Sequence, residues 1–239
     1  MTSKVEGHLD DATRPRTLRL VGSLTAAVYL LACLFFIKGP DVYSRAGREL
    51  FTWFCVLSLL PLFRKGYKLV EASDERRVTR TIILFGALFC LFAFFTFPFH
   101  STDVFGYINR GWQQVHYHQN PYVYAVGDIR GWRQDPMLWN HWIYNPNPYG
   151  FLFSLLARLV GYAAGGNWWA MLFMFKLLNV TAYALTAWLV WSGAKHAGYR
   201  RPALALYVVL WNPLLLLHHI ANGHNDLLVG CLLALAFYL

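Results

Sequence analysis

The sequence predicts an all-α protein: a polytopic bundle of transmembrane helices with a long extracytoplasmic loop that contains short interfacial helices. Three observations favour this fold class. Hydrophobic residues make up 57% of the 239 residues and charged residues only 14%, whereas a soluble domain carries about 25% charged residues. Several apolar runs reach the roughly 20 helical residues that cross a bilayer. The lysines and arginines gather between these runs and form no basic face, which argues against a nucleic-acid partner.

Five apolar runs are expected to cross the membrane. Runs 18–37 and 79–99 have the full length, 168–191 and 203–221 reach it with a few polar residues, and 45–63 is a shorter candidate. Run 226–239 stops about six residues short of a crossing. No internal repeat or Gly/Ser linker divides the chain. We therefore expect 1–239 to be a single membrane domain that belongs to a longer protein.

The basic clusters predict the orientation of the chain. They precede the first span, connect the second and third, and follow run 168–191; their members are Lys4, Arg14, Arg16, Arg19, Arg64, Lys65, Lys68, Arg76, Arg77, Arg80, Lys195, Arg200 and Arg201. Under the positive-inside rule these segments and the N-terminus are cytoplasmic, so loop 100–149 is extracytoplasmic. Counting 150–164 as a span would place the last cluster outside. We therefore expect 150–164 to form a helix that lies at the outer interface of the cell membrane or dips into the membrane and back.

Loop 100–149 is expected to be ordered. A connection of about fifty residues is uncommon and is usually functional or disordered. This loop is rich in tyrosine and tryptophan, which bury large areas and disfavour disorder. Ser101 is a suitable N-cap for a helix over about 102–115, and the later prolines break the rest into short pieces.

Asp103 is the candidate catalytic residue because it is the first carboxylate after a long apolar span. At that position it can face an amphiphilic substrate whose head lies at the interface, and act as a general base. The alternative is an acid that only stabilises the N-terminus of a helix. Helical spacing places Asp103, Tyr107 and Arg110 on one face, which fits substrate binding or a simple ion pair.

Amide and aromatic side chains later in the loop suit sugar recognition. The candidate substrate-binding residues here are Asn120, Tyr122, Tyr144, Asn145 and Tyr149. Amides bond sugar hydroxyls, and aromatic rings cover the apolar face of a pyranose. The alternative is an aromatic belt with proline turns, which many membrane proteins possess.

A second polar cluster follows run 203–221. We expect His224, Asn225 and Asp226 to bind substrate hydroxyls, with Asp226 facing the same cavity as the acid of the outer loop, within about 15 Å. The alternative is that Asn225 and Asp226 only cap the final helix. A metal site is conceivable but not favoured, because the adjacent His218 and His219 diverge on a helix. The cysteines lie in apolar runs without CxxC spacing and are expected to be core residues.

Lys176 lies within run 168–191, where a lysine is by default a functional candidate. A phosphate-bearing lipid would be its natural partner. The alternative is snorkelling of the side chain toward the interface. Arg110 and Arg158 are the other candidates for this phosphate contact.

Short motifs occur in a defined order over about 99–239. They are STDVFGY at 101–107, Gly111, NPY at 120–122, YNPNPYG at 144–150, WNPL at 211–214 and GHND at 223–226. Together they resemble the integral-membrane GT-C glycosyltransferases, and most of all the bacterial polyprenol-phosphomannose-dependent mannosyltransferases. The resemblance implies that the chain is the N-terminal part of a longer GT-C module in a bacterial cytoplasmic membrane.

The resemblance also implies an activity. A sugar, most naturally mannose, would pass with inversion from a polyprenyl-phosphate donor to a glycan or lipid acceptor at the outer face of the membrane. Asp103 occupies the position of the catalytic base. The chain contains neither GxxxxGK[ST] nor GxGxxG, and no cofactor is expected. The expected partners are therefore membrane lipid, the donor and the acceptor.

Two other classes of function remain open. A transporter or flippase of lipid-linked sugars would share an aromatic cavity and an intramembrane cation, but it typically has helices broken at matching positions of two repeats. No such repeat is visible in the sequence. A structural subunit would need neither Asp103 nor the second polar cluster.

Overall fold

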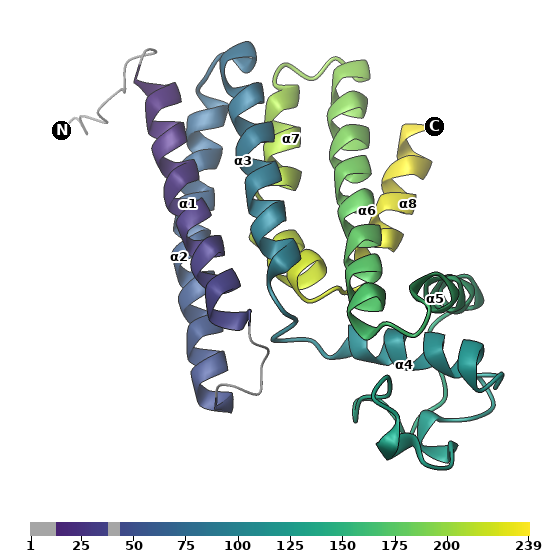
Figure 1. Ribbon diagram of the computed structural model, residues 1–239. Helices are drawn as coiled ribbons and strands as arrows, with labels where there is room; N and C mark the ends of the chain where they lie inside the picture. The colour runs from purple at the N-terminus through teal and green to yellow at the C-terminus, as the bar shows by residue number, and fades with distance from the viewer. Residues whose placement is uncertain (1–12, 38–43) are drawn as a thin grey trace, which may run out of the picture.

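The computed structural model describes residues 13–37 and 44–239, and these residues contain no β-strand. The helices are α1 (Arg14–Phe36), α2 (Arg45–Glu71), α3 (Glu75–Phe95), α4 (Asp103–His116), η2 (Val126–Asp128), η3 (Trp132–Gln134), α5 (Phe151–Ala164), α6 (Trp168–His196), α7 (Pro202–Leu210), η4 (Leu215–Ala221) and α8 (Asp226–Tyr238) (Figure 1). The all-α prediction is confirmed for the described part of the chain.

Helices α1, α2, α3 and α6 are long and apolar enough to cross a membrane. They correspond to four of the expected spans, so the protein is a multi-pass membrane protein. The second of them is longer than expected, because α2 continues to Glu71 with Pro61 inside it. The final helix, α8, has 13 residues within the described chain.

The expected span 203–221 is not one straight helix. It consists of α7 and the π-helix η4, which are bent by 50° relative to each other. Pro213 lies at the break and has no N–H for a helical hydrogen bond. The side chain of Asn212 accepts a hydrogen bond from the backbone N–H of Leu214 at 3.0 Å. The break therefore leads into η4, just before the turn that carries His224.

The basic clusters lie at one end of the bundle, as the charge count predicts. Figure 1 shows the start of α1, the α2–α3 turn and the α6–α7 turn at this end, and α4, α5 and the outer loop at the opposite end. The Arg14 guanidinium donates to the carbonyl of Ala72, which joins two of the basic segments. Lys4 lies outside the described residues.

Helices α4 and α5 pack against each other and against α6, near the end where α6 begins (Figure 1). Gly111 permits this contact, because a Cβ at that position would lie 2.5 Å from the carbonyl oxygen of Ala157. With 14 residues, α5 is shorter than the roughly 20 residues of a crossing. Its length and direction agree with the interfacial helix expected over 150–164.

The loop between α4 and α5 is ordered around a small core of its own. That core contains Val126, Ile129, Trp132, Leu138 and Ile143. Asn109 ties it to α4: its amide nitrogen donates to the carbonyls of Trp139 and His141 at 2.8 and 3.1 Å. Such satisfied backbone groups are typical of a folded segment. The prediction that the aromatic loop is ordered is therefore confirmed.

Candidate active site

Asp103 is the first residue of α4, and its carboxylate faces the turn between η4 and α8. Its Oδ2 accepts a hydrogen bond from the Tyr149 hydroxyl at 3.2 Å and lies 2.9 Å from Nε2 of His224. The helix starts one residue later than expected, and Ser101 Oγ accepts the backbone N–H of Asp103 at 3.3 Å. The carboxylate therefore has tertiary partners that a simple helix-capping acid would not need.

The partners of Asp103 set the protonation states of the site. The hydrogen bond from His224 is the main cause of a lowered pKa at Asp103, and the same contact raises the pKa of His224. Burial, followed by the charge of Asp103, raises the pKa of Tyr149 to about 12. At neutral pH Asp103 is therefore an ionised carboxylate and Tyr149 a protonated donor.

The turn before α8 is fixed to the entrance of α4 by Asn222. The Asn222 Oδ1 atom accepts three backbone N–H groups, those of Phe99, His100 and Ser101, at 2.8, 2.8 and 3.2 Å. Its amide nitrogen donates to the carbonyl of Leu217. Because Asn222 is buried, these bonds hold the two polar clusters of the sequence together.

Tyr107 and Asn225 form a second link between the clusters. The Tyr107 hydroxyl donates to Asn225 Oδ1 at 3.0 Å, and the Tyr107 ring meets the Tyr149 ring edge-on with centroids 4.9 Å apart. Tyr107 is only 1% exposed, so it packs behind Tyr149 and Asn225 and holds both in position. Asn225 occupies the N-cap position of α8 without a side-chain capping bond. The side chain of Asn225 therefore does not cap the final helix, which was the alternative to a role in the site.

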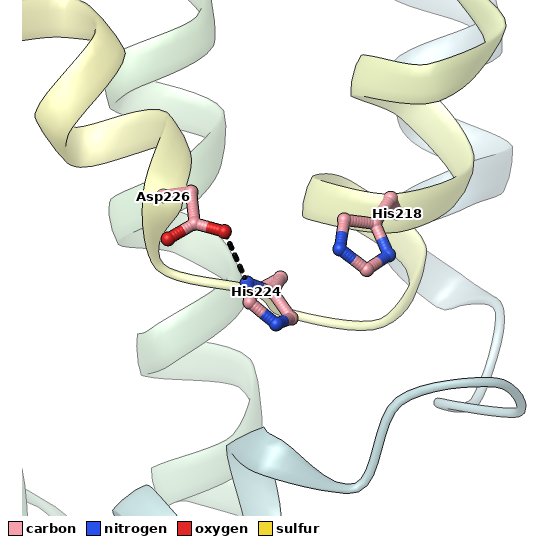
Figure 2. A group of neighbouring side chains, drawn as sticks. All are labelled: His218, His224 and Asp226. Carbon is pink, nitrogen blue, oxygen red and sulfur yellow. Dashed lines mark ion pairs between the residues drawn. The ribbon is translucent and has the colours of Figure 1, made fainter. Parts of the chain in front are cut away.

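Asp226 faces the same site as Asp103. Its Oδ2 lies 2.9 Å from Nδ1 of His224 (Figure 2), while Nε2 of that ring contacts Asp103. A single imidazole ring therefore separates the two carboxylates, well within the expected limit of about 15 Å. The two carboxylates are therefore as close as expected, while their place in one shared cavity and the binding of sugar hydroxyls by His224, Asn225 and Asp226 stay predictions.

Arg110 does not form the ion pair that helical spacing allows. Its guanidinium is buried and donates to the carbonyls of Gly106, Trp142, Asn145 and Pro146 at 3.3, 3.0, 3.0 and 3.5 Å. Burial lowers the pKa of Arg110. These contacts favour a role in shaping the outer loop over the expected contact with a phosphate.

Lys176 is likewise occupied by backbone groups. Its Nζ donates to the carbonyls of Ala93 and Thr96 at the end of α3, at 3.2 and 2.5 Å. The side chain is 1% exposed, so it neither snorkels nor points into the site. A cation suits the C-terminal end of a helix, where the free carbonyls carry partial negative charge. The geometry favours this capping role over the expected phosphate contact.

Asn120 and Tyr122 line a cavity that does not include Asp103. It has a volume of about 480 Å³ and also contains Arg158, the third candidate for a phosphate contact. The Tyr122 hydroxyl donates to the backbone carbonyl of Tyr149 at 2.9 Å, and the Tyr149 hydroxyl in turn donates to Asp103. A role of Asn120 and Tyr122 in substrate binding would therefore be at a second, neighbouring site.

Tyr144 and Asn145 lie on the outer surface of the loop. Tyr144 is 73% exposed, and Asn145 contributes its backbone carbonyl to Arg110. The structure does not bring their side chains to Asp103. Of the residues chosen from the YNPNPYG motif, only Tyr149 reaches that carboxylate.

A cavity of about 700 Å³ extends from the site between α5, α6 and α8. Tyr149 and Asn225 line its polar end. The rest of its wall is almost entirely apolar and includes Leu156, Leu178, Leu185, Leu228 and Leu232. Tyr149, which donates a hydrogen bond to Asp103, is therefore also part of the wall of a groove suited to an apolar chain.

Comparison with known proteins assigns the chain to a family. Residues 17–239 match the family described as "Alpha-(1->6)-mannopyranosyltransferase, N-terminal domain". The chain belongs to this family. It is 30% identical over 174 residues to alpha-(1->6)-mannopyranosyltransferase A of Corynebacterium glutamicum, covering 69% of this chain and 34% of that protein. It is 31% identical over 135 residues to the protein of the same name from Mycobacterium tuberculosis, covering 55% of this chain and 25% of that protein.

These matches cover about a third or less of the two curated mannosyltransferases. No solved structure matches the chain significantly. The family assignment confirms the resemblance to mannosyltransferases inferred from the short motifs. The motifs from Asp103 to Tyr149 and from His224 to Asp226, which lie within the matched residues, are thus brought together in a member of a mannosyltransferase family.

Two residues near the site were not chosen as site residues from the sequence. Asn222 was visible as one of several polar residues after the 203–221 run, but its bonds to the N–H groups before α4 depend on the tertiary fold. His218 was considered as one ligand of a metal site of three histidines and an aspartate, which was not favoured. Its ring instead stacks on His224, with centroids 4.4 Å apart. The π-helical form of η4 was not predictable from the motif.

Proposed function

We propose that this chain contains the catalytic base and part of the donor site of a mannosyltransferase. The full-length enzyme transfers mannose, with inversion, from a polyprenyl-phosphate donor to a glycan or lipid acceptor at the outer face of the membrane. The observation that carries the proposal is the position of the Asp103 carboxylate. It contacts His224 and accepts a hydrogen bond from Tyr149, and Tyr149 also lines an apolar groove. Membership of a mannosyltransferase family supports the choice of sugar.

Asp103 acts as the general base. It takes the proton of an acceptor hydroxyl while the oxygen attacks the anomeric carbon, and the bond to the polyprenyl phosphate breaks on the opposite face of the sugar. This single displacement inverts the anomeric centre. Both of the contacts described above use Oδ2, so Oδ1 is the oxygen available to the acceptor.

The groove beside α8 binds the prenyl chain of the donor. Its walls bind an apolar chain, because each buried CH₂ group contributes roughly 0.8 kcal/mol. Tyr149 and Asn225 lie where the phosphate and sugar would follow that chain. In this arrangement the anomeric carbon reaches Asp103 while the prenyl chain remains between the helices.

Filling this groove should weaken donor binding. Leu232 lines the groove and Leu233, its neighbour on α8, does not; they are 58% and 57% exposed, respectively. We expect Leu232→Trp to raise the KM for the polyprenyl donor by about tenfold, which corresponds to the loss of roughly 1.4 kcal/mol of binding energy. Leu233→Trp serves as the matched control. Equal effects of both substitutions would mean that this face of α8 packs against protein and not against the donor.

The site is placed at the outer face of a bacterial cytoplasmic membrane, with the N-terminus inside. The positive-inside rule supports this orientation, because the basic clusters share the opposite end of the bundle. A cysteine at exposed Arg130 in the outer loop should react with an impermeant thiol reagent added to intact cells. A cysteine at Tyr199 in the α6–α7 turn, 72% exposed, should not. The described native cysteines are all buried and should give little background. The opposite labelling pattern would invert the orientation.

Sugar transfer by the full-length protein tests the function directly. Membranes that contain it should move label from radiolabelled polyprenyl-phosphate mannose to an acceptor. A flippase would move the labelled donor across the bilayer and leave the sugar–phosphate bond intact. A structural subunit would do neither. The Asp103→Asn protein is the appropriate negative control.

A further inference from the structure

Three side chains near Asp103 form a group with the composition of a metal site. They are His218 on η4, His224 in the following turn and Asp226 at the start of α8 (Figure 2). One potential ligand atom from each lies within 4.8 Å of the other two. The cysteines, which are the other common transition-metal ligands, are buried at separate positions. This group is the one such cluster in the described residues.

Both ring nitrogens of His224 lie close to a carboxylate. Its Nε2 lies 2.9 Å from Asp103, and its Nδ1 lies 2.9 Å from Asp226. Nδ1 is nevertheless buried and has no hydrogen-bond partner among the described residues. A neutral imidazole that donates from Nε2 has a lone pair at Nδ1. A lone pair and a carboxylate oxygen at 2.9 Å repel each other unless a positive charge lies between them.

A metal ion near both atoms fits the direction of this contact. A proton on Nδ1 would produce a hydrogen bond to Asp226, and the direction of the contact does not satisfy one. Two ligands of one metal ion, each at about 2.0–2.2 Å from it, are instead brought close together without pointing at each other. The short but misdirected contact of His224 and Asp226 has this form.

We propose that His218, His224 through Nδ1, and Asp226 bind a divalent transition-metal ion of the Zn²⁺ type. Two imidazoles and a carboxylate are a ligand set that Zn²⁺ uses when it keeps a fourth position open. The rings of His218 and His224 are stacked with centroids 4.4 Å apart, so the His218 ring must turn for one nitrogen of each ring to face the same ion. The side chain of Asp226 is 66% exposed and can rotate to complete the site.

The contact between Asp103 and His224 completes the second shell of this site. A metal-bound histidine usually donates its other ring N–H to a carboxylate, which fixes the tautomer and the orientation of the ring. Asp103 accepts in this way at Nε2. His219 does not belong to the site, because its Nδ1 contacts the backbone carbonyl of His224 at 3.3 Å.

A metal ion here would also supply positive charge next to Asp103. The donors of Arg110 and Lys176 described above bond backbone carbonyls instead. A dication beside Asp103 can bind a phosphate oxygen of the donor in its open position and offset the charge of the leaving group. This second role rests on the proposed function, whereas metal binding itself does not.

Metal binding should be measured on the purified full-length protein without any sugar substrate. After removal of metal with a chelator, titration calorimetry with Zn²⁺ should give about one strong site per chain, as expected for a single cluster of three ligands. His218→Ala and Asp226→Asn should each weaken that site by at least tenfold. The control is His196→Gln, at the opposite end of the bundle, which should bind like the wild type.

Thermal unfolding separates loss of the site from misfolding. Zn²⁺ should raise the Tm of the wild type and of His196→Gln, because a ligand that binds only the folded state stabilises it. It should not raise the Tm of His218→Ala or Asp226→Asn, whose metal-free Tm should match that of the wild type. Equal Zn²⁺ affinity in all four proteins, or no strong site in the wild type, would overturn the proposal. Sugar transfer by a variant that no longer binds Zn²⁺ would overturn only the role of the ion toward the donor phosphate, and strong Zn²⁺ binding without transfer would contradict only the proposed function.

Discussion

Asp103→Asn should abolish sugar transfer by the full-length protein. Removing a general base costs about 10²–10⁴-fold in rate, and this loss should appear in kcat because the base acts in the chemical step. Asparagine has the same shape and still accepts hydrogen bonds from Tyr149 and His224, but it cannot take the proton. We expect the Tm to change by only a few degrees, since the Asp103 side chain is 20% exposed and retains its partners.

A second acid of the same loop provides the control. Asp135 accepts hydrogen bonds from the Trp112 indole at 2.8 Å and the Tyr117 hydroxyl at 2.7 Å, and it has no described contact with the site. Asp135→Asn should lower the Tm and leave kcat nearly unchanged. Near-full transfer by Asp103→Asn, or an equal loss of kcat in both variants, would exclude Asp103 as the base.

The fold was largely predictable because its determinants are local. Span length and apolar composition mark α1, α3 and α6, and the distribution of lysine and arginine places loop 100–149 opposite the basic turns. The bend between α7 and η4 was not predicted. Asn212 and Pro213 indicate that the helix is interrupted, but the angle between α7 and η4 depends on how η4 packs against α3.

The site was only partly predictable because it joins segments that are far apart in the sequence. Position after a span identified Asp103, and the density of polar residues identified His224 and Asp226. Which of them touch depends on Asn222, which ties the turn to the segment before α4. A buried arginine or lysine can bind a substrate, or it can donate to backbone carbonyls of the same protein. The sequence does not distinguish these cases for Arg110 and Lys176.

Arg110 gives the second large expected effect. Arg110→Met keeps the apolar stem but removes the donors to the carbonyls of Trp142, Asn145 and Pro146. A buried acceptor left unsatisfied costs about 1–3 kcal/mol, so we expect a loss of roughly 2–4 kcal/mol in the stability of the outer loop. Because this segment leads directly to Tyr149, the hydroxyl that bonds Asp103 should also be displaced. Both the Tm and kcat should therefore fall.

The comparison with other variants decides between the two roles of Arg110. Arg110→Lys should not restore activity, because one ammonium group cannot reproduce the fork of a guanidinium that bonds several carbonyls. Exposed Arg130 offers the control: Arg130→Met should leave both quantities unchanged. If Arg110 instead binds the donor phosphate, as its position in the sequence allows, Arg110→Met would raise the KM for the donor at an unchanged Tm, and Arg110→Lys would recover most of the loss. The rate of proteolysis of the outer loop also separates the two roles. Loss of the carbonyl contacts should expose residues 142–146 to a protease, whereas loss of a phosphate contact should leave the rate unchanged.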